Sequence, residues 1–127
     1  MIDQTVVDSV VSARTPAAKL RGYWAVKITP VVARYGGEEF AIILPYHTPL
    51  QAQTVSDLVH DAIRQLKIEH RTSSLSCRRV TVSMGIASVL PVASHSPSLL
   101  VMAADDALYQ AKHAGRDRTT LYLPHRG

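Results

Sequence analysis

A short glycine-rich segment with two acidic residues offers the clearest chemistry in this sequence. The segment reads RYGGEEF over residues 34–40. Glycine lets a backbone approach a ligand closely, and carboxylate oxygens are the hard ligands that magnesium needs before it can bridge phosphates. The pattern therefore predicts a metal and phosphate site at the tip of a turn, built from Gly36, Gly37, Glu38 and Glu39.

An ordinary Gly-Gly turn with solvated glutamates explains the same residues. Glycines are common in turns for conformational reasons alone. The segment by itself favours neither interpretation, so the rest of the chain has to decide.

The other residue types that could do chemistry predict less. No two histidines stand at metal-ligand spacing on a predicted helix face, so exposed or capping roles are expected; they are His47, His60, His70, His95, His113 and His125. The single Cys77 cannot form an internal disulfide and is expected to pack as a small side chain. Asp105 and Asp106 are expected to be solvated or structural.

A β-hairpin is the element expected to carry the two glutamates. Residues 31–35 and 40–44 are apolar, β-prone runs joined around Gly36 and Gly37. Adjacent glycines supply the positive φ angles that tight hairpin turns require. The hairpin places both acids directly after its tip.

Two helices are predicted after the hairpin. Thr48 and Pro49 are typical of a helix start, and apolar residues then recur at the spacing of a core-facing stripe: Val55, Leu58, Val59, Ala62, Ile63 and Leu66. Ser96 and Pro97 open the second helix, and Gly115 ends it. Its predicted buried face is Leu99, Leu100, Ala103, Ala104, Ala107, Leu108 and Ala111.

Strands are predicted around these helices. Residues 79–86 alternate between apolar and polar, which indicates a strand with one face on the core, and residues 119–123 form a last strand. The valines near the start predict a short helix over residues 3–13, and residues 24–28 alternate like a short strand. The sum is an α+β fold, a mostly antiparallel sheet with helices packed on it.

Composition limits the classes of function. The chain has 127 residues with 46% hydrophobic and 19% charged, which predicts one compact unit rather than disorder. The net charge is +4, but the basic residues are scattered, so no nucleic-acid partner is expected. No apolar run approaches the roughly 18 residues of a membrane span, and the start lacks the pattern of a signal peptide. These features predict a cytoplasmic protein without a membrane partner.

Three segments resemble the GGDEF family of diguanylate cyclases, in its GGEEF variant. They read RYGGEEFAIILP over 34–45, VTVSMGIA over 80–87 and ADDALYQAKHAGRDR over 104–118, in family order. The resemblance implies a palm-like, nucleotide-cyclase-like sheet fold. It also implies magnesium or manganese as cofactor and GTP as substrate. Two copies face each other as a homodimer, and each 3′-hydroxyl attacks the other nucleotide's α-phosphorus to give cyclic di-GMP and pyrophosphate.

The resemblance assigns roles to particular residues. Glu38 matches the metal-binding carboxylate, Glu39 the neighbouring catalytic acid, and the two glycines the turn on which nucleotide packs. Lys112 and Arg116 match cations on the terminal phosphates, and their i, i+4 spacing predicts one face of the last helix. The alternative for this pair is a favourable interaction with the helix dipole, worth about 0.3 to 1 kcal/mol.

The first 30 residues depart from the family. The upstream D-x-D-x-F-K-x-x-N-D motif, with a second metal-binding aspartate and the residues that read guanine, is missing. We therefore divide the chain into an atypical segment, 1–30, and a truncated GGDEF-like domain, 31–127. A weak or inactive cyclase is expected from the isolated chain. The alternative is a non-catalytic module that binds a guanine nucleotide or a protein partner, with or without a sensor domain.

Overall fold

The computed structural model describes residues 6–13, 30–34, 36–73, 75–76, 78–90 and 93–124, and of residues 6–13 the backbone only. The strand predicted over 24–28 therefore lies outside the described residues, as do Cys77 and His125.

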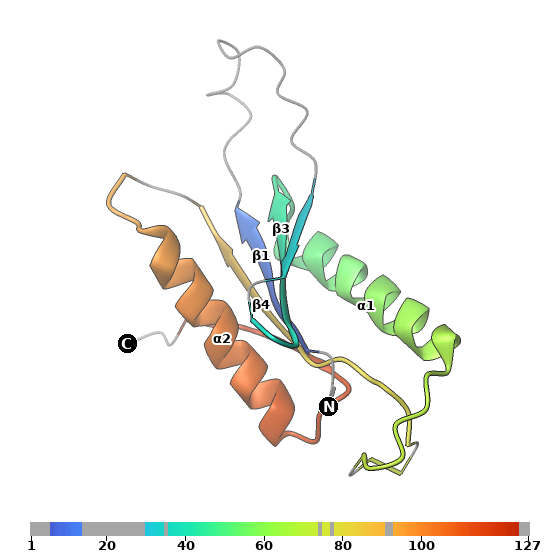
Figure 1. Ribbon diagram of the computed structural model, residues 1–127. Helices are drawn as coiled ribbons and strands as arrows, with labels where there is room; N and C mark the ends of the chain where they lie inside the picture. The colour runs from blue at the N-terminus through green and yellow to red at the C-terminus, as the bar shows by residue number, and fades with distance from the viewer. Residues whose placement is uncertain are drawn as a thin grey trace.

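A five-stranded sheet forms the centre of the fold (Figure 1). Its strands are β1 (Val6–Ala13), β2 (Val31–Arg34), β3 (Glu39–Pro45), β4 (Met84–Val89) and β5 (Thr119–Leu121). They lie side by side in the order β2-β3-β1-β4-β5. The first strand of the chain is thus the middle strand of the sheet.

The helix predicted over residues 3–13 is wrong where the structure describes it, because Val6–Ala13 is a strand. β1 is hydrogen-bonded to β3 on one side and to β4 on the other. Valine is stiff at χ1 and packs well on a pleated surface. Pairing on both sides therefore overrides the helical spacing of the valines.

The expected mostly antiparallel sheet is also wrong. β2 pairs with β3 antiparallel, as the hairpin prediction required, but the pairs β1–β3, β1–β4 and β4–β5 are parallel. The register shows the direction of each strand. Ala13 pairs with Pro45 and Val31 pairs with Ile43, so β1 ends and β2 begins at the same end of β3. β1 must then run against β2 and along β3.

Two helices cover opposite faces of this sheet (Figure 1). α1 (Pro49–Leu66) packs through Val55, Val59 and Ile63 on a core that includes Leu44, Met84 and Ile86. α2 (Pro97–His113) packs on the other side, where Ala104 is buried with Ala87. Within the described residues, neither helix is long and apolar enough to cross a membrane.

α1 begins where the sequence predicts, and half of its predicted stripe packs on the core, namely Val55, Val59 and Ile63. Thr48 forms a capping box, in which its side chain accepts from the Gln51 N–H and the Gln51 side chain accepts from the Thr48 N–H. The buried residues of the helix are Ala52, Ser56 and His60. Three members of the predicted stripe are exposed instead: Leu58, Ala62 and Leu66. Polar residues occupy the buried positions because they have hydrogen-bond partners there, as described below.

β4 is buried on both faces, not on one as predicted. Every residue from Thr81 to Ala87 is buried, and the strand itself begins only at Met84. A strand covered by a helix on each side has no solvent face. α2 covers its side with small residues, Ala104, Ala107 and Ala111, whereas Leu99, predicted to be buried, is exposed.

Gly85 is the closest point between β4 and α2. A Cβ atom added there would lie 2.1 Å from the carbonyl oxygen of Ala104 and 2.4 Å from the backbone nitrogen of Leu108. Both atoms belong to the helix backbone, so no side chain can rotate away to make room. α2 can lie this close to the sheet only because position 85 has no side chain.

We expect Gly85→Ala to destabilise the protein, because the methyl group forces α2 away from β4. Overpacking of this kind typically costs about 1–3 kcal/mol. Urea unfolding followed by circular dichroism measures the loss. The matched control is Gly37→Ala, where an added Cβ has no neighbour within 4 Å. Equal stability of the two variants would contradict this account of Gly85.

Candidate functional site

The predicted glycine turn joins β2 to β3 and is held by its own side chains. Arg34 ends β2, pairs with Phe40, and donates from Nε to the carbonyl oxygen of Gly37 at 2.9 Å. Its Nη2 donates to the same oxygen, and the guanidinium carbon lies 6.0 Å from the centroid of the Phe40 ring. The N–H of Glu39 donates to the Gly36 carbonyl at 3.2 Å. The turn therefore has a defined shape without any ligand.

The two glycines leave room for different reasons. A Cβ on Gly36 would lie 2.6 Å from Oε2 of Glu39, so the absent side chain makes space for that carboxylate. A Cβ on Gly37 would meet nothing within 4 Å, so the surface there is open. The positive φ expected from adjacent glycines is not found at Gly37. Gly37 therefore leaves space for a ligand because it lacks a side chain, and not because it adopts a left-handed backbone conformation.

Both glutamates are half-buried and have free carboxylates. Glu38 immediately precedes β3 and Glu39 is its first residue. Within the part of the chain that the structure describes, neither side chain makes a hydrogen bond or an ion pair. Two adjacent negative charges thus remain uncompensated beside an open glycine.

The two predicted cations follow each other at the end of α2, but they do not share a helix face as expected. Lys112 lies in the last turn of α2, whereas the helix ends at His113 and Arg116 lies beyond it. Gly115 takes a φ of 117°, which glycine permits, and Arg116 follows with a φ of 63°. The N–H of Arg116 donates to the Ala111 carbonyl at 3.0 Å. The chain then turns into β5.

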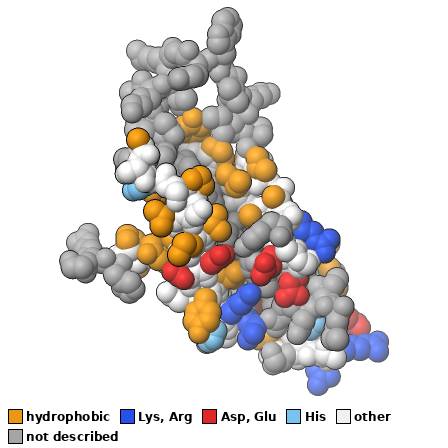
Figure 2. Space-filling model, turned by 60° about the vertical axis from the view of Figure 1, so that its left-hand side comes forward, with side chains coloured by type: hydrophobic (Ala, Val, Ile, Leu, Met, Phe, Trp, Pro, Cys, Tyr) orange, Lys and Arg blue, Asp and Glu red, His pale blue; other side chains and the backbone are white. Residues whose placement is uncertain are grey.

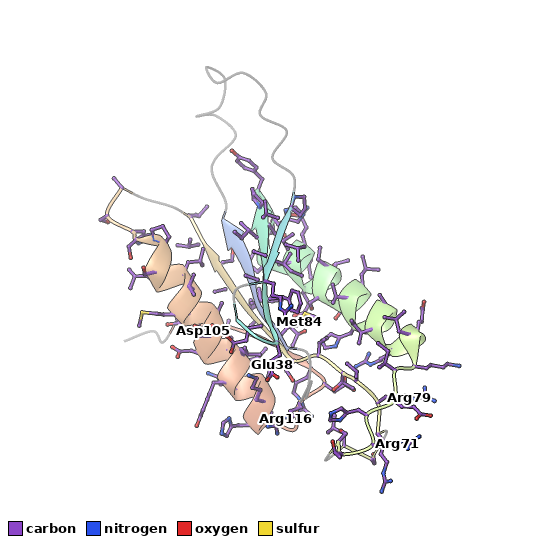
Figure 3. The ribbon with its side chains drawn as sticks, viewed as in Figure 1. Glu38, Arg71, Arg79, Met84, Asp105 and Arg116 are labelled. Atoms are coloured by element: carbon purple, nitrogen blue, oxygen red, sulfur yellow. The ribbon has the colours of Figure 1, made fainter. Side chains whose placement is uncertain are left out.

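The acids and the cations lie at the same end of the sheet. Glu39 begins β3 and Thr119 begins β5, and both strands run parallel to β1 and β4. Figure 3 shows Glu38 and Arg116 at this end, on different elements. Three strand spacings separate β3 from β5, about 14 Å at about 4.8 Å each.

No hydrogen bond or ion pair joins the two groups among the described residues, and the side chains of Lys112 and Arg116 also lack such partners. Figure 2 shows acidic and basic side chains close together on one part of the surface, beneath a larger hydrophobic area. Free carboxylates and free cations along one edge suit a ligand that carries both phosphates and a metal ion.

The described residues do not form a complete metal cage. They contain no group of three or more His, Cys, Asp or Glu side chains that could hold a metal ion. Asp105 is half-buried in α2 and Asp106 is exposed, and neither belongs to such a group. Magnesium keeps several waters and commonly binds through one or two carboxylates together with substrate phosphates. Glu38 and Glu39 fit that mode of binding.

A buried histidine next to this edge contradicts the expectation for His60. Its side chain is buried in α1, and Nε2 lies 2.9 Å from Oγ1 of Thr119 in β5. The same Thr119 oxygen lies 3.0 Å from Oγ of Ser56, which donates to the Gln53 carbonyl at 2.9 Å. Ser56 and His60 stand one helical turn apart, which the sequence shows, but Thr119 is too distant in the chain for the sequence to indicate it.

Burial lowers the pKa of His60 below its ordinary value of 6.5, and the nearby Arg64 guanidinium lowers it further. The carboxylates of Asp117, Asp57 and Asp61 act in the opposite direction and only partly offset these effects. Nδ1 of His60 has no hydrogen-bond partner among the described residues and lies 3.7 Å from Oδ1 of Asp117. His60 is therefore neutral at neutral pH.

Comparison with known proteins identifies the family of this chain. The family model described as "Diguanylate cyclase, GGDEF domain" matches residues 17–118. The chain therefore belongs to the GGDEF domain family, which confirms the resemblance seen in the three sequence motifs.

Curated relatives share this family. "Diguanylate cyclase VdcA" of Vibrio cholerae is 38% identical over 85 residues, which cover 67% of this chain and 24% of that protein. "Probable diguanylate cyclase DgcC" of Escherichia coli K12 is 38% identical over 89 residues, 70% of this chain and 23% of that protein. "Diguanylate cyclase A" of Treponema denticola is 34% identical over 89 residues, with the same two shares. The chain thus spans about a quarter of the length of these relatives.

We expect acid to destabilise the protein partly through His60. Because folding lowers the pKa of His60, the unfolded chain takes up its proton first as the pH falls. The contribution of neutral His60 is fully present above pH 6.5 and is lost progressively below it. Urea unfolding between pH 7.5 and 5 should show a smaller loss of stability in His60→Gln than in the wild type.

The exposed His95 supplies the control for this measurement. His95→Gln should keep the wild-type dependence of stability on pH. If His60→Gln and the wild type lost stability in parallel, the role given to His60 would be wrong.

Proposed function

We propose that this chain binds GTP at the edge formed by the glycine turn and the end of α2, as a diguanylate cyclase-type domain that is weak or inactive in isolation. One observation carries the proposal: two unpaired carboxylates and two unpaired cations lie at the same end of one sheet. The two glutamates and Lys112 are half-buried and Arg116 is exposed, so all four charges are accessible to a ligand. A nucleoside triphosphate with its metal ion offers partners for charges of both signs.

Each residue then has a distinct part in binding. Lys112 and Arg116 contact the terminal phosphates, and Gly37 provides an open surface on which the nucleotide packs. Glu38 and Glu39 hold a divalent ion, magnesium or manganese, which when bound neutralises charge on the phosphate oxygens. The turn is held in shape by Arg34, so little ordering is needed on binding.

The proposed reaction needs two copies of the domain. In each half-reaction the 3′-hydroxyl of one GTP attacks the α-phosphorus of the other, the bond to the β-phosphate oxygen breaks, and pyrophosphate leaves. Two such steps close cyclic di-GMP. One chain holds one nucleotide, so catalysis requires a homodimer with its two sites facing each other.

A second candidate function is a binding module without turnover, which recognises a guanine nucleotide or a protein partner. It is favoured by the lack of a third metal ligand among the described residues. GTP binding is common to the first candidate and the nucleotide form of the second. Product formation separates them.

We expect GTP binding in the presence of magnesium to weaken about tenfold or more in Arg116→Gln and in Lys112→Met, because each variant loses a charge-assisted contact to phosphate. Isothermal titration calorimetry measures the dissociation constants. Arg79→Gln removes an exposed cation that belongs neither to the glycine turn nor to the end of α2. Arg79 pairs with Glu69 and lies beside Arg71, to one side of Arg116 in Figure 3, so the variant should bind GTP like the wild type. Uniform weakening in all three variants would point to net charge rather than to this site.

We expect cyclic di-GMP to form slowly, with a specific rate that rises with protein concentration because two chains must meet, and to be lost in Glu38→Gln. Chromatography of the products after incubation with GTP and magnesium measures it. Glu69→Gln is the matched control, since Glu69 is exposed and pairs with Arg71 at 3.6 Å, away from the turn. No product at any concentration, with GTP still bound, would favour the binding module.

A further inference from the structure

The turn that carries Arg116 cannot hold its shape by itself. Gly115, Arg116 and Asp117 are three consecutive residues with positive φ, at 117°, 63° and 47°. The left-handed region is unfavourable for residues with a side chain, and such conformations persist only where surrounding contacts fix them. Two of these three residues are not glycine, so contacts from elsewhere must hold this turn.

Those contacts come from α1, on the side of the sheet opposite α2. Nη2 of Arg64 donates to Oδ1 of Asp117 at 3.0 Å. Nδ1 of His60 lies 3.7 Å from the same oxygen, while its Nε2 meets Thr119, two residues further along. The arrangement fixes both the side chain of Asp117 and the start of β5. Arg118 adds a local contact, because its Nε donates to the Arg116 carbonyl at 3.0 Å.

We infer that Arg64 and His60 are positioning residues for Arg116. Arg64 holds Asp117 by a hydrogen bond, His60 holds Thr119, and these two contacts fix the left-handed turn that places Arg116 at the edge of the sheet. The inference rests on the proposed function for the role of Arg116 toward phosphate. It adds that α1, which lies across the sheet from α2, determines where the phosphate-binding cation stands.

The geometry gives Arg64 this role rather than a direct one. Its guanidinium is shared between Asp117 at 3.0 Å and Asp61 at 3.8 Å, so its charge is already compensated. The side chain of Arg116 has no such partner within the described residues and remains available to a ligand. Arg64 and Asp117 are both partly exposed, with 49% and 31% of their side chains accessible, so their pairing serves geometry more than global stability.

Hydrogen exchange tests the positioning without any nucleotide. The amide of Arg116, which donates to the Ala111 carbonyl, should exchange several-fold faster in Arg64→Gln and in Asp117→Asn than in the wild type. Arg64→Lys keeps the charge and should restore part of the protection. The amide of Ala107, in the buried part of α2, should be unaffected, which distinguishes a loosened turn from general unfolding. Unchanged exchange at Arg116 would overturn the inference.

A double-mutant cycle on GTP binding tests the link to phosphate. Arg64→Gln should weaken GTP binding by about 2- to 30-fold, the range expected for residues that act through a network. The same change should have almost no effect in the Arg116→Gln background, because there is no cation left to position. The positioning role would be overturned if Arg64→Gln weakened GTP binding equally in both backgrounds. It would also be overturned if the wild type bound GTP and Arg64→Gln left that binding unchanged.

The two measurements separate this inference from the proposed function. If the wild type does not bind GTP, and exchange at Arg116 is still faster in Arg64→Gln, the proposed function fails and the control of the turn by α1 stands. If GTP binds and exchange at Arg116 does not change, the proposed function stands and the inference fails.

Discussion

The close contact between Gly85 and the backbone of α2 is the constraint on which the rest of the structure depends. It brings a helix and a strand together at a distance that admits no side chain. The small residues Ala104, Ala107 and Ala111 continue the same close packing along the helix. Because cores are densely packed and transmit displacements, the depth of α2 at Gly85 also determines where its last turn ends, and with it the position of Lys112.

The two faces of the sheet contribute differently to the candidate site. On one face, α2 packs through alanines and carries the chain to Arg116. On the other face, α1 reaches past the sheet edge with the polar residues Ser56, His60 and Arg64, spaced one turn apart. Apolar packing determines the distance between α2 and the sheet, and directional hydrogen bonds from α1 determine the shape of the turn that follows α2. The candidate site lies where these two kinds of control meet.

Much of this fold could be predicted because the signals are local. The hairpin around the glycines, the capped start of α1 at Thr48 and the end of α2 near Gly115 each depend on residues within a few positions. The predictions that proved wrong concern residues whose contacts are with residues far away in the sequence. β1 is a strand because β3 and β4 flank it, and His60 is buried because Thr119 receives it. Arg116 does not lie on the predicted helix face because α2 ends at His113 and the positive φ angles of Gly115 and Arg116 change the chain direction.

The central place of β1 has a consequence for the order in which the chain assembles. β1 is made first during synthesis, but both of its neighbours come later, and β4 ends only at Val89. Until then β1 lacks a partner on one side, and an unpaired strand edge is prone to join other chains. Parallel pairing across such a long stretch is also slow, since loop closure must precede the contacts that reward it. The middle of the sheet is therefore completed only after β4 has been made.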